Sequence, residues 1–371
     1  MPQQLTVPCC VMRGGTSKGP FFNLADLPAA GPARDRLLLA IMGSPDRRQV
    51  DGLGGAHALT SKVGMVSLGD KAGTGIDLHF LFAQLQPESD RVDTTPNCGN
   101  MLAAVVPFAL ETGLISAQGA TTTVRVLTEN TGMLSDITVQ TPNGHISYEG
   151  DARIDGVPGT SAPIQISFLD TAGSVCGSLL PTGQAIDVFD LPGLGAIEAT
   201  CIDNGMPMVL VRASDLERTG QESIAELNAD EGLKARLEAL RLVAAQKMGL
   251  GDVSQKNYPK MCLLSAPQAG GAISTRCFIP HVCHDAIGVL AAVTVATACV
   301  LPEAIAYGLS QRPTDGAAAP LSIEHPSGEF SVVLTVSADA AGGPVVAGAA
   351  LLRTARLIMK GDVSVLASGQ A

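Results

Sequence analysis

The chain has no tryptophan, few other aromatic residues and no long apolar run. A membrane-spanning helix needs about 20 consecutive apolar residues, so the sequence predicts no such helix and no membrane partner. The N-terminus, Met1-Pro2-Gln3-Gln4, has neither the basic segment nor the apolar core of a signal peptide. These absences favour a soluble, cytoplasmic protein.

Positive charge is also scarce. The sequence has 24 Lys and Arg against 35 Asp and Glu, a formal net charge of −11, and no block of basic residues. Nucleic acid is therefore not an expected partner, because it requires clustered cations. An acidic protein can still bind an acidic small molecule where a few cations line one site. With 371 residues, of which 46% are hydrophobic, the chain is long enough for two domains or one large one.

Motifs that would indicate a cofactor are missing. The glycine spacing at 14–19 matches neither a Walker A loop nor a dinucleotide-binding fingerprint. The nine cysteines are odd in number and lack paired Cys-x-x-Cys spacing, which favours reduced thiols. We expect neither a cofactor nor a metal.

The many glycines and the alternating segments indicate a strand-rich α/β (α+β) protein. Predicted strands cover 5–12, 63–68, 78–86, 121–127, 136–141, 162–168, 185–189, 196–202, 260–265, 274–278, 321–323 and 329–336. Predicted helices cover 33–42, 97–111, 224–248 and 287–299.

Two of these helices resemble each other. Leu102-Ala103-Ala104-Val105 and Leu290-Ala291-Ala292-Val293 are alanine-rich and 290 − 102 = 188 residues apart, about half the chain. We interpret this as an internal duplication, with one central helix in each of two similar domains. The alternative is a chance likeness between two apolar helices.

The segment at 12–22 reads Met-Arg-Gly-Gly-Thr-Ser-Lys-Gly-Pro-Phe-Phe. Glycines allow a close approach of the backbone, so Arg13, Ser17 and Lys18 are expected to bind one small carboxylate together with backbone amides. A surface turn with two solvated charges is the alternative.

A second motif, Thr60-Ser61-Lys62-Val63, follows a glycine-rich loop and begins an apolar strand. A partly desolvated lysine amine at such a position can act as a base. A strand-end lysine in water is the alternative.

The third motif is Asn97-Cys98-Gly99-Asn100. Asn97 is predicted to cap the helix and to place Cys98 in the first turn, where a thiolate and an anionic ligand are both favoured. The alternative is a buried structural thiol.

A fourth cluster spans Cys277 to Asp285 and contains His281, Cys283 and His284. Zinc is one interpretation, although the spacing of paired ligands is missing. A polar loop that leads into the second central helix is the favoured interpretation.

The sequence offers cationic side chains, a thiol and helix N-termini, but no cofactor motif. This combination favours proton transfer at an activated carbon acid. The motifs at 12–19, 51–55, 60–63 and 97–100 also resemble the PrpF family of isomerases, and the likeness extends through Arg353-Thr354-Ala355-Arg356. The resemblance implies a diaminopimelate epimerase-like fold: two similar domains, each a curled mixed or antiparallel sheet around a central helix.

The resemblance also implies roles for particular residues. The family's lysine and serine match Lys62 and Ser17, and Cys98 matches a catalytic cysteine of the epimerases. Met101 and Asp285 depart from the epimerase pattern of two symmetric thiols. Substrate-binding roles are expected for Arg13, Gly14, Gly15, Thr16, Lys18, Ser61, Asn97, Gly99, Asn100, His281, Cys283 and Asp285.

The segments 43–51 and 280–284 are most similar to the 4-oxalomesaconate tautomerases of the family, which act in aromatic acid degradation. We therefore expect a keto–enol or allylic proton shift in a small tricarboxylate or dicarboxylate. Methylaconitate or methylitaconate isomerisation, amino-acid epimerisation and non-catalytic binding of an acid remain open. Expected domains are 1–183 and 184–342, with the tail 343–371 returning to the first and the site in the cleft between them. The oligomeric state is open, a homodimer included.

Overall fold

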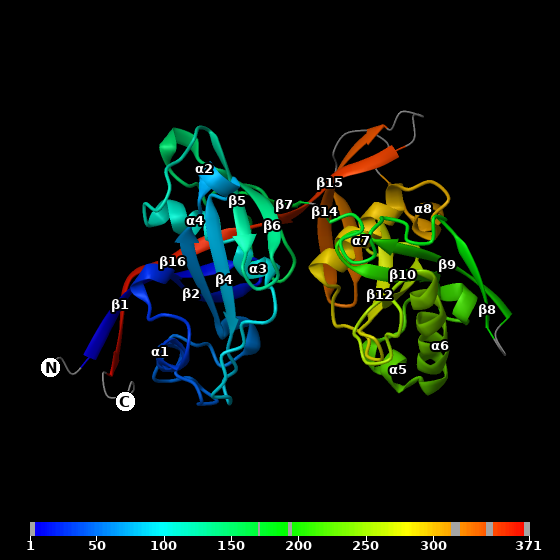
Figure 1. Cartoon of the computed structure of the whole chain (residues 1–371), viewed down its shortest axis with the longest axis horizontal. Coiled ribbons are helices and arrows are strands. Elements are labelled where there is room, and N and C mark those ends of the chain that lie inside the picture. Colours follow the sequence, from blue (N-terminus) through cyan, green and yellow to red (C-terminus); the bar gives the residue numbers. More distant parts are fainter. Residues whose placement is uncertain (1–3, 170, 192–194, 313–319, 339–343, 367–371) are drawn as a thin grey trace. The chain divides into compact units, whose positions relative to one another are not determined.

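The computed structural model describes residues 4–169, 171–191, 195–312, 320–338 and 344–366. The chain divides into two compact units, Met1–Leu169 with Leu352–Ala371, and Asp170–Leu351. Figure 1 labels the helices and strands of both units. The domain limits at 183 and 342 stay predictions, and of the predicted tail only 344–366 is described.

The first unit contains a mixed sheet whose strands run in the order β16-β1-β2-β3-β4-β5-β6-β7. The strands are β1 (Gln4–Gly14), β2 (Ser17–Asn23), β3 (Lys62–Leu68), β4 (Leu78–Gln84), β5 (Thr121–Thr128), β6 (Met133–Gln140), β7 (Ile164–Phe168) and β16 (Ala355–Leu366). Its helices are α1 (Pro32–Met42), α2 (Lys71–Thr74), α3 (Gly99–Leu102) and α4 (Val105–Glu111), with 3₁₀ turns η1 (Leu24–Asp26), η2 (Ala58–Thr60) and η3 (Pro142–Gly144).

The second unit has strands in the order β15-β14-β13-β12-β11-β10-β9-β8. They are β8 (Asp187–Leu191), β9 (Gly195–Asp203), β10 (Pro207–Arg212), β11 (Lys260–Ser265), β12 (Ile273–Phe278), β13 (Leu321–His325), β14 (Gly328–Ala338) and β15 (Pro344–Arg353). Helices are α5 (Ile224–Ala229), α6 (Glu231–Lys247), α7 (Val289–Val300) and α8 (Ile305–Leu309), with the 3₁₀ turn η4 (Ala213–Leu216).

The two sheets repeat one pattern of strand directions, which confirms the predicted duplication. Starting from β16 in one unit and from β8 in the other, neighbouring pairs are antiparallel twice, parallel, antiparallel, parallel, and antiparallel twice. Helices connect the equivalent strands, α3–α4 after β4 and α7–α8 after β12. The units differ in the origin of one edge strand: β8 directly precedes β9, whereas β16 comes from the end of the chain.

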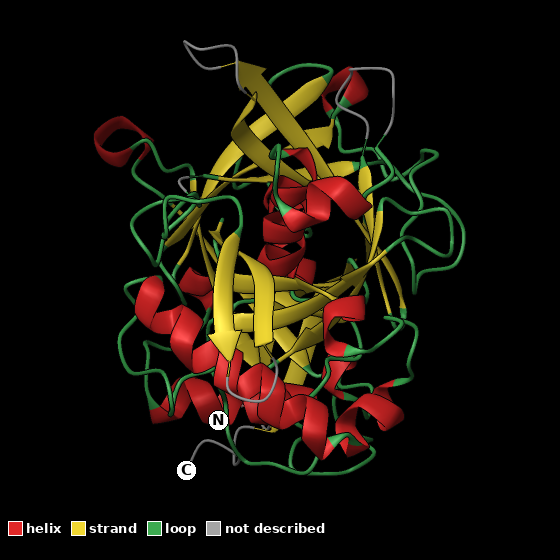
Figure 2. Ribbon diagram, turned by 90° about the vertical axis from the view of Figure 1, so that its right-hand side faces the viewer, coloured by secondary structure: helices red, strands yellow, loops and turns green. Residues whose placement is uncertain are grey.

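A central helix packs against one face of each sheet. Residues 291–299 of α7 are all buried, so this part of the helix is covered on every side, and Figure 2 shows a helix enclosed by strands. In the first unit the Phe21 ring of β2 contacts Phe108 of α4, with 5.9 Å between ring centroids. The opposite face packs against α1, because Phe22 belongs to the same buried cluster as Leu38. Among the described helices, none combines the length and apolarity of a membrane span.

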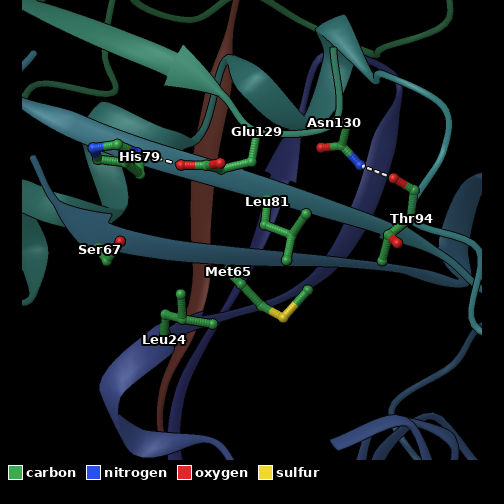
Figure 3. Close-up of a pocket in the computed structure, with 8 residues that line it drawn as sticks. All are labelled: Leu24, Met65, Ser67, His79, Leu81, Thr94, Glu129 and Asn130. Atoms are coloured by element: carbon green, nitrogen blue, oxygen red, sulfur yellow. Dashed lines mark hydrogen bonds and ion pairs between the residues drawn. The ribbon is translucent and has the colours of Figure 1, made fainter. Parts of the chain in front are cut away.

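Strand register decides which side chains share a face. In β3 and β4, Met65 lies opposite Leu81 and Ser67 opposite His79, and Figure 3 shows these four on one face. Since side chains alternate along a strand, Lys62 points to the other face, where α3 and α4 lie.

Two of the predicted helices are interrupted. The helix predicted at 97–111 is α3 and α4, and the break falls at Ala103 and Ala104. Pro107 has no N–H to donate to the Ala103 carbonyl, which explains the break. The helix predicted at 224–248 is α5 and α6, because Asp230 stops one and caps the other.

Four strands were not predicted: β2 and β10 in the middle of the sheets, and β15 and β16 in the segment that was expected only as a returning tail. Strand β2 was predicted as a turn, but the turn is confined to Gly15 and Thr16. Strand β10 was not predicted, because its Pro-Met-Val-Leu-Val segment is apolar throughout and does not alternate.

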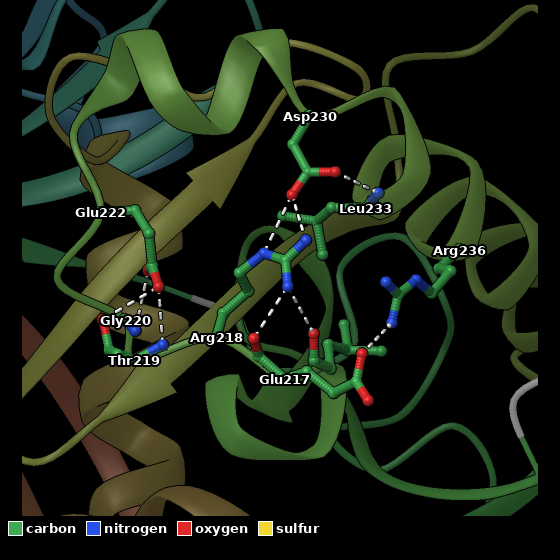
Figure 4. Close-up of polar contacts among 9 residues, drawn as sticks. Glu217, Arg218, Thr219, Gly220, Glu222, Asp230, Leu233 and Arg236 are labelled. Atoms are coloured by element: carbon green, nitrogen blue, oxygen red, sulfur yellow. Dashed lines mark hydrogen bonds and ion pairs between the residues drawn. The ribbon is translucent and has the colours of Figure 1, made fainter.

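Asp230 fixes the start of α6 (Figure 4). Its Oδ1 accepts a hydrogen bond from the Leu233 amide (2.9 Å), and its Oδ2 accepts from Arg218 Nε (2.9 Å) and Nη2. The Leu233 amide first, and then the Arg218 guanidinium, hold the pKa of Asp230 below its ordinary value.

We predict that Asp230→Ala lowers the free energy of unfolding by about 1–2 kcal/mol at pH 7, because a helix cap and an ion pair are lost. Because the pKa of Asp230 is lower in the folded than in the unfolded protein, its charged form stabilises the fold at pH values above the unfolded pKa. The difference in unfolding free energy between wild type and Asp230→Ala should therefore shrink as the pH falls below about 4. Urea unfolding at several pH values measures this. The exposed Asp190→Ala is the control, and an equal loss in both variants would contradict the prediction.

Candidate functional site in the first unit

Lys62 is the first residue of β3 and points to the face that carries α3. Only 8% of its surface is exposed. Its Nζ donates to Gln84 Oε1 (2.9 Å), contacts Cys98 Sγ (3.5 Å) and lies 5.0 Å from the centroid of the Phe82 ring. A buried amine thus has an oxygen, a sulfur and an aromatic face around it.

Gln84 holds this arrangement in place. It lies directly opposite Lys62 in the antiparallel pair of β3 and β4. Its Nε2 donates to the carbonyls of Ala58, Ser61 and Leu85, so the amide is fixed and its oxygen can only face the lysine. Sequence reasoning missed Gln84, although its place at the end of a predicted strand was a usable signal.

The backbone of β2 passes very close to Lys62. An ideal Cβ on Gly19 would lie 1.8 Å from the Lys62 carbonyl oxygen, so only glycine is accommodated there. Ser17 is two residues earlier and therefore on the same face. It is 1% exposed, and its hydroxyl has no hydrogen-bond partner in the described part of the chain. A buried, unpaired hydroxyl on the face of the lysine is the kind of group that a ligand satisfies.

The glycine turn packs against the start of α3. An ideal Cβ on Gly14 would lie 2.4 Å from the Asn100 carbonyl oxygen, and one on Gly15 would lie 2.1 Å from Asn100 Oδ1. Asn100 Nδ2 donates to Thr16 Oγ1 (3.0 Å). These two glycines and Thr16 therefore position the helix that follows Cys98.

Arg13 and Lys18 do not share a face with Ser17. Arg13 lies opposite Lys18 across β1 and β2, whereas Ser17 lies opposite Gly14. The guanidinium of Arg13 donates to the carbonyls of Gly15 (2.9 Å) and Thr354 (3.1 Å), and burial lowers its pKa. Strand alternation therefore directs the side chains of Arg13 and Lys18 to one face and that of Ser17 to the other, although all three residues border one small cavity. The binding of one carboxylate by these residues stays a prediction.

Cys98 precedes the first turn of α3 and is almost fully buried. Asn97 does not cap this helix as predicted; its Oδ1 accepts from the Cys98 amide (2.7 Å) instead. The helix begins at Gly99, and Cys98 itself occupies the N-cap position without a side-chain cap bond. Its sulfur is therefore not used by the helix.

Ser61 is fully buried and donates to Gln49 Oε1 (2.8 Å). The same oxygen accepts from the Ala56 amide (2.9 Å). Gln49, which sequence reasoning also missed, thus orders the glycine-rich loop before Lys62. The contacts of Ser61 are those of a positioning residue.

The candidate residues of the fourth cluster belong to the second unit. His281 is exposed, and its Nδ1 lies 3.8 Å from Glu238 Oε2. Cys283 is buried, and burial raises its pKa to about 11, which disfavours a thiolate. Asp285 is exposed. The structure therefore does not bring these three side chains together.

Cavity volume does not identify the site. A cavity of about 500 Å³ is lined by Met65, Leu81, His79 and Glu129 among others, on the face opposite Lys62 (Figure 3). A smaller cavity of about 160 Å³ borders Arg13, Thr16, Ser17 and Lys18 together with Gly156. We place the candidate site at Lys62 because three buried groups there can exchange protons. They are the Lys62 amine, the Cys98 thiol that contacts it and the Ser17 hydroxyl on the same face.

Known proteins that are similar to this chain are named as isomerases. The family model described as PrpF protein matches residues 4–366. A 4-oxalomesaconate tautomerase of Pseudomonas putida is 52% identical over 98% of this chain and 97% of its own length. A (4E)-oxalomesaconate Delta-isomerase of Novosphingobium sp. is 52% identical over 97% of this chain and 98% of its own. A solved methylitaconate-delta-isomerase is 33% identical, covers 100% of this chain and 98% of its own, and has a TM-score of 0.86.

The fold and these relatives define the class of protein as an isomerase built from two duplicated α+β units. The chain belongs to the PrpF family. The fold class and the family resemblance inferred from the sequence are thereby confirmed.

The close approach at Gly19 generates a prediction. Gly19→Ala should force β2 away from Lys62, lower the free energy of unfolding by about 1–3 kcal/mol and reduce isomerase activity. Gly361→Ala in β16 is the matched control, because a Cβ there meets nothing within 4 Å. Thermal unfolding and turnover should be measured on both variants. A Gly19→Ala protein as stable and active as the control would refute the strand contact.

Proposed function

We propose that this protein catalyses a proton-shift isomerisation of 4-oxalomesaconate, an unsaturated keto tricarboxylate. The observation that carries the proposal is the buried contact between Lys62 Nζ and Cys98 Sγ, 3.5 Å apart, with Ser17 on the same face. The two relatives at 52% identity bear the names of enzymes that act on this acid, which supports the choice of substrate.

The substrate's chemistry suits such a pair. A carbon between a ketone and a conjugated double bond is acidic, because its carbanion is delocalised onto oxygen and the unsaturated carboxylate. In the proposed mechanism the Lys62 amine takes that proton. The proton returns either to the ketone oxygen, which gives the enol, or to the far carbon, which moves the double bond. In both cases one proton leaves and one is returned, so no redox step occurs.

Cys98 and Ser17 complete the proposal. The Cys98 thiol is close enough to exchange a proton with the lysine, so it can relay the proton between the two ends of the delocalised system. The unpaired Ser17 hydroxyl donates to the developing oxyanion or to a carboxylate. Gln84 keeps the amine aimed at the reacting carbon through its fixed oxygen.

A second candidate is the corresponding allylic shift in methylitaconate. It is favoured by the solved methylitaconate-delta-isomerase, whose chain aligns over the whole of this one. The two candidates share the proton carrier and differ in the substituents that the site must bind.

We predict that wild type in D₂O rapidly exchanges and isomerises 4-oxalomesaconate, as followed by proton NMR. Lys62→Met should reduce the rate by about 10²–10⁴-fold, the usual contribution of a positioned general base. Lys71→Met removes an exposed lysine that pairs with Asp77 and should retain full rate. The same reaction in H₂O distinguishes the products, because the enol has two olefinic CH signals and no methylene signal, whereas the product with the shifted double bond has one of each.

The same NMR assay tests the relay. Cys98→Ser should slow product formation more than it slows the first deuterium exchange, since it leaves the base in place. Full activity in Lys62→Met would refute the proposed base. Turnover of methylitaconate and not of 4-oxalomesaconate would select the second candidate.

A further inference from the structure

Strand β16 forms one edge of the sheet in the first unit. It pairs with β1, as Figure 1 shows, and has no second neighbour among the described strands. The backbone N–H and C=O groups along a strand point alternately to its two sides, so one set of these groups on β16 faces away from β1. Outside the ladder with β1, residues 358–364 form no backbone–backbone hydrogen bond with any described residue. An edge with free backbone groups is a site at which a strand of another chain can pair.

Both faces of this edge are open. Residues 358–362 are all exposed, and so is Ser364. Because successive side chains of a strand point to opposite faces, this exposure leaves both faces accessible to a partner. Two of the exposed side chains, Ile358 and Met359, are apolar and lose contact with water when a second strand pairs alongside. An ideal Cβ on Gly361 meets no atom within 4 Å, so its own unit does not block an approaching strand at this position.

The two charged residues next to Gly361 have no counter-ion in the described part of the first unit. Asp362 forms no hydrogen bond or ion pair with any described residue. Lys360 Nζ donates to the Glu111 carbonyl at the end of α4 but forms no ion pair within the described chain. An ammonium and a carboxylate, two residues apart and therefore on one face, are thus available to groups outside the unit.

The sequence of this edge is complementary to itself when two copies of β16 pair antiparallel. If the two-fold axis passes through Gly361, each Lys360 lies directly opposite the Asp362 of the other copy, which gives two pairs of opposite charge. The same register places Met359 opposite Val363, which are both apolar. Directly opposite pairs of either kind stabilise a sheet.

Other registers lack this match. An axis through Lys360 or through Asp362 places two like charges opposite each other, which destabilises the pair. A shift of one residue leaves both charges opposite uncharged residues, and a parallel pair in register sets each charge beside its own kind. Charged residues on an edge oppose pairing with arbitrary strands, so Lys360 and Asp362 favour a second β16 over other partners.

We propose that β16 is a self-association surface, at which two copies of this chain pair antiparallel about a two-fold axis through Gly361. The occupant of the edge is a second β16, and the sheets of the two first units become one continuous sheet. Charge complementarity between Lys360 and Asp362 selects this partner and this register. Only residues of the first unit take part, and the association does not depend on the proposed reaction.

Sedimentation velocity measures the association. Wild type should form dimers within a range of about 1–100 µM, in which interfaces of modest size associate. Asp362→Lys turns both charge pairs into repulsive ones and should raise the dimer dissociation constant about 10- to 100-fold. Asp190→Lys, the same substitution at an exposed position of β8, is the matched control and should dimerise as wild type.

A charge swap tests the pairing itself. Lys360→Asp alone should weaken the dimer as Asp362→Lys does, because carboxylate then faces carboxylate. The double variant Lys360→Asp/Asp362→Lys restores two pairs of opposite charge and should regain the wild-type dissociation constant within a few fold. Thermal unfolding of each variant shows whether the fold is retained. Asp362→Lys keeps the contact between Lys360 and Glu111, so it decides the proposal even where a swap variant folds poorly.

A cysteine at the axis gives a structural readout. Residues directly opposite in an antiparallel pair have Cα atoms about 4.5–5.5 Å apart, which lies within the range of a disulfide. Gly361→Cys should therefore give a disulfide-linked dimer with oxidised glutathione, which is reduced to two glutathione thiols as the two cysteines are oxidised. Ser364→Cys, which lies opposite Ile358 in this register, is the control and should not link. The native cysteines are the same in both variants, and all but Cys176 are buried.

Wild type that stays monomeric over the whole concentration range would overturn the proposal, since the edge would then be unpaired or would serve another partner. A dimer that withstands Asp362→Lys, or that links no better through Gly361→Cys than through Ser364→Cys, would also overturn it, because its interface would lie elsewhere. Failure of a folded charge-swap variant to dimerise would refute the register. Turnover of 4-oxalomesaconate enters none of these measurements, so this proposal and the proposed function can fail separately.

Discussion

Burial of the Lys62 amine is the constraint on which the first unit depends. A buried ammonium or amine is costly unless its donors are satisfied, and water is largely excluded from this position. Gln84, Cys98 and the Phe82 ring satisfy it. Each of the three must then be held by its own neighbours, and this explains why Gln84 donates three times to backbone carbonyls. The same burial requires glycine at position 19, because the backbone of β2 passes directly against the Lys62 carbonyl and leaves no room for a side chain.

The duplication shows how one framework carries two chemical environments. Both sheets place a lysine at the start of the fourth strand from one edge, Lys62 in β3 and Lys260 in β11, near the N-cap of a central helix. The residue at that cap differs, cysteine in one unit and glycine in the other. The Lys62 amine contacts the Cys98 thiol, whereas Lys260 lies beside a glycine at the equivalent position. The duplicated framework thus carries different side chains at equivalent positions without any change of fold.

Much of the fold could be predicted from the sequence. Segments such as 121–127 and 287–299 indicate their local structure directly. A strand buried on one face alternates apolar and polar residues, whereas a helix buried on all faces is a continuous run of apolar and small residues. Strand β10 and the break at Ala103 were missed for local reasons, a fully apolar strand and a proline three residues into the next helix. Lys62, Cys98 and Ser17 were found through motifs, and the structure places the first two in contact. Their catalytic roles stay predictions.

By itself, the sequence determined the family, the duplicated α+β architecture and the lysine and cysteine at the centre of the candidate site. These depend on short motifs and on local periodicity, both of which are written along the chain. Only the tertiary structure showed that the side chains of Arg13 and Lys18 lie on the opposite face of the sheet from that of Ser17, and only it revealed Gln49 and Gln84. The reason is physical: which face a side chain occupies depends on strand register, and which residues meet depends on pairing between segments far apart in the chain. Neither quantity leaves a period or a motif in the sequence.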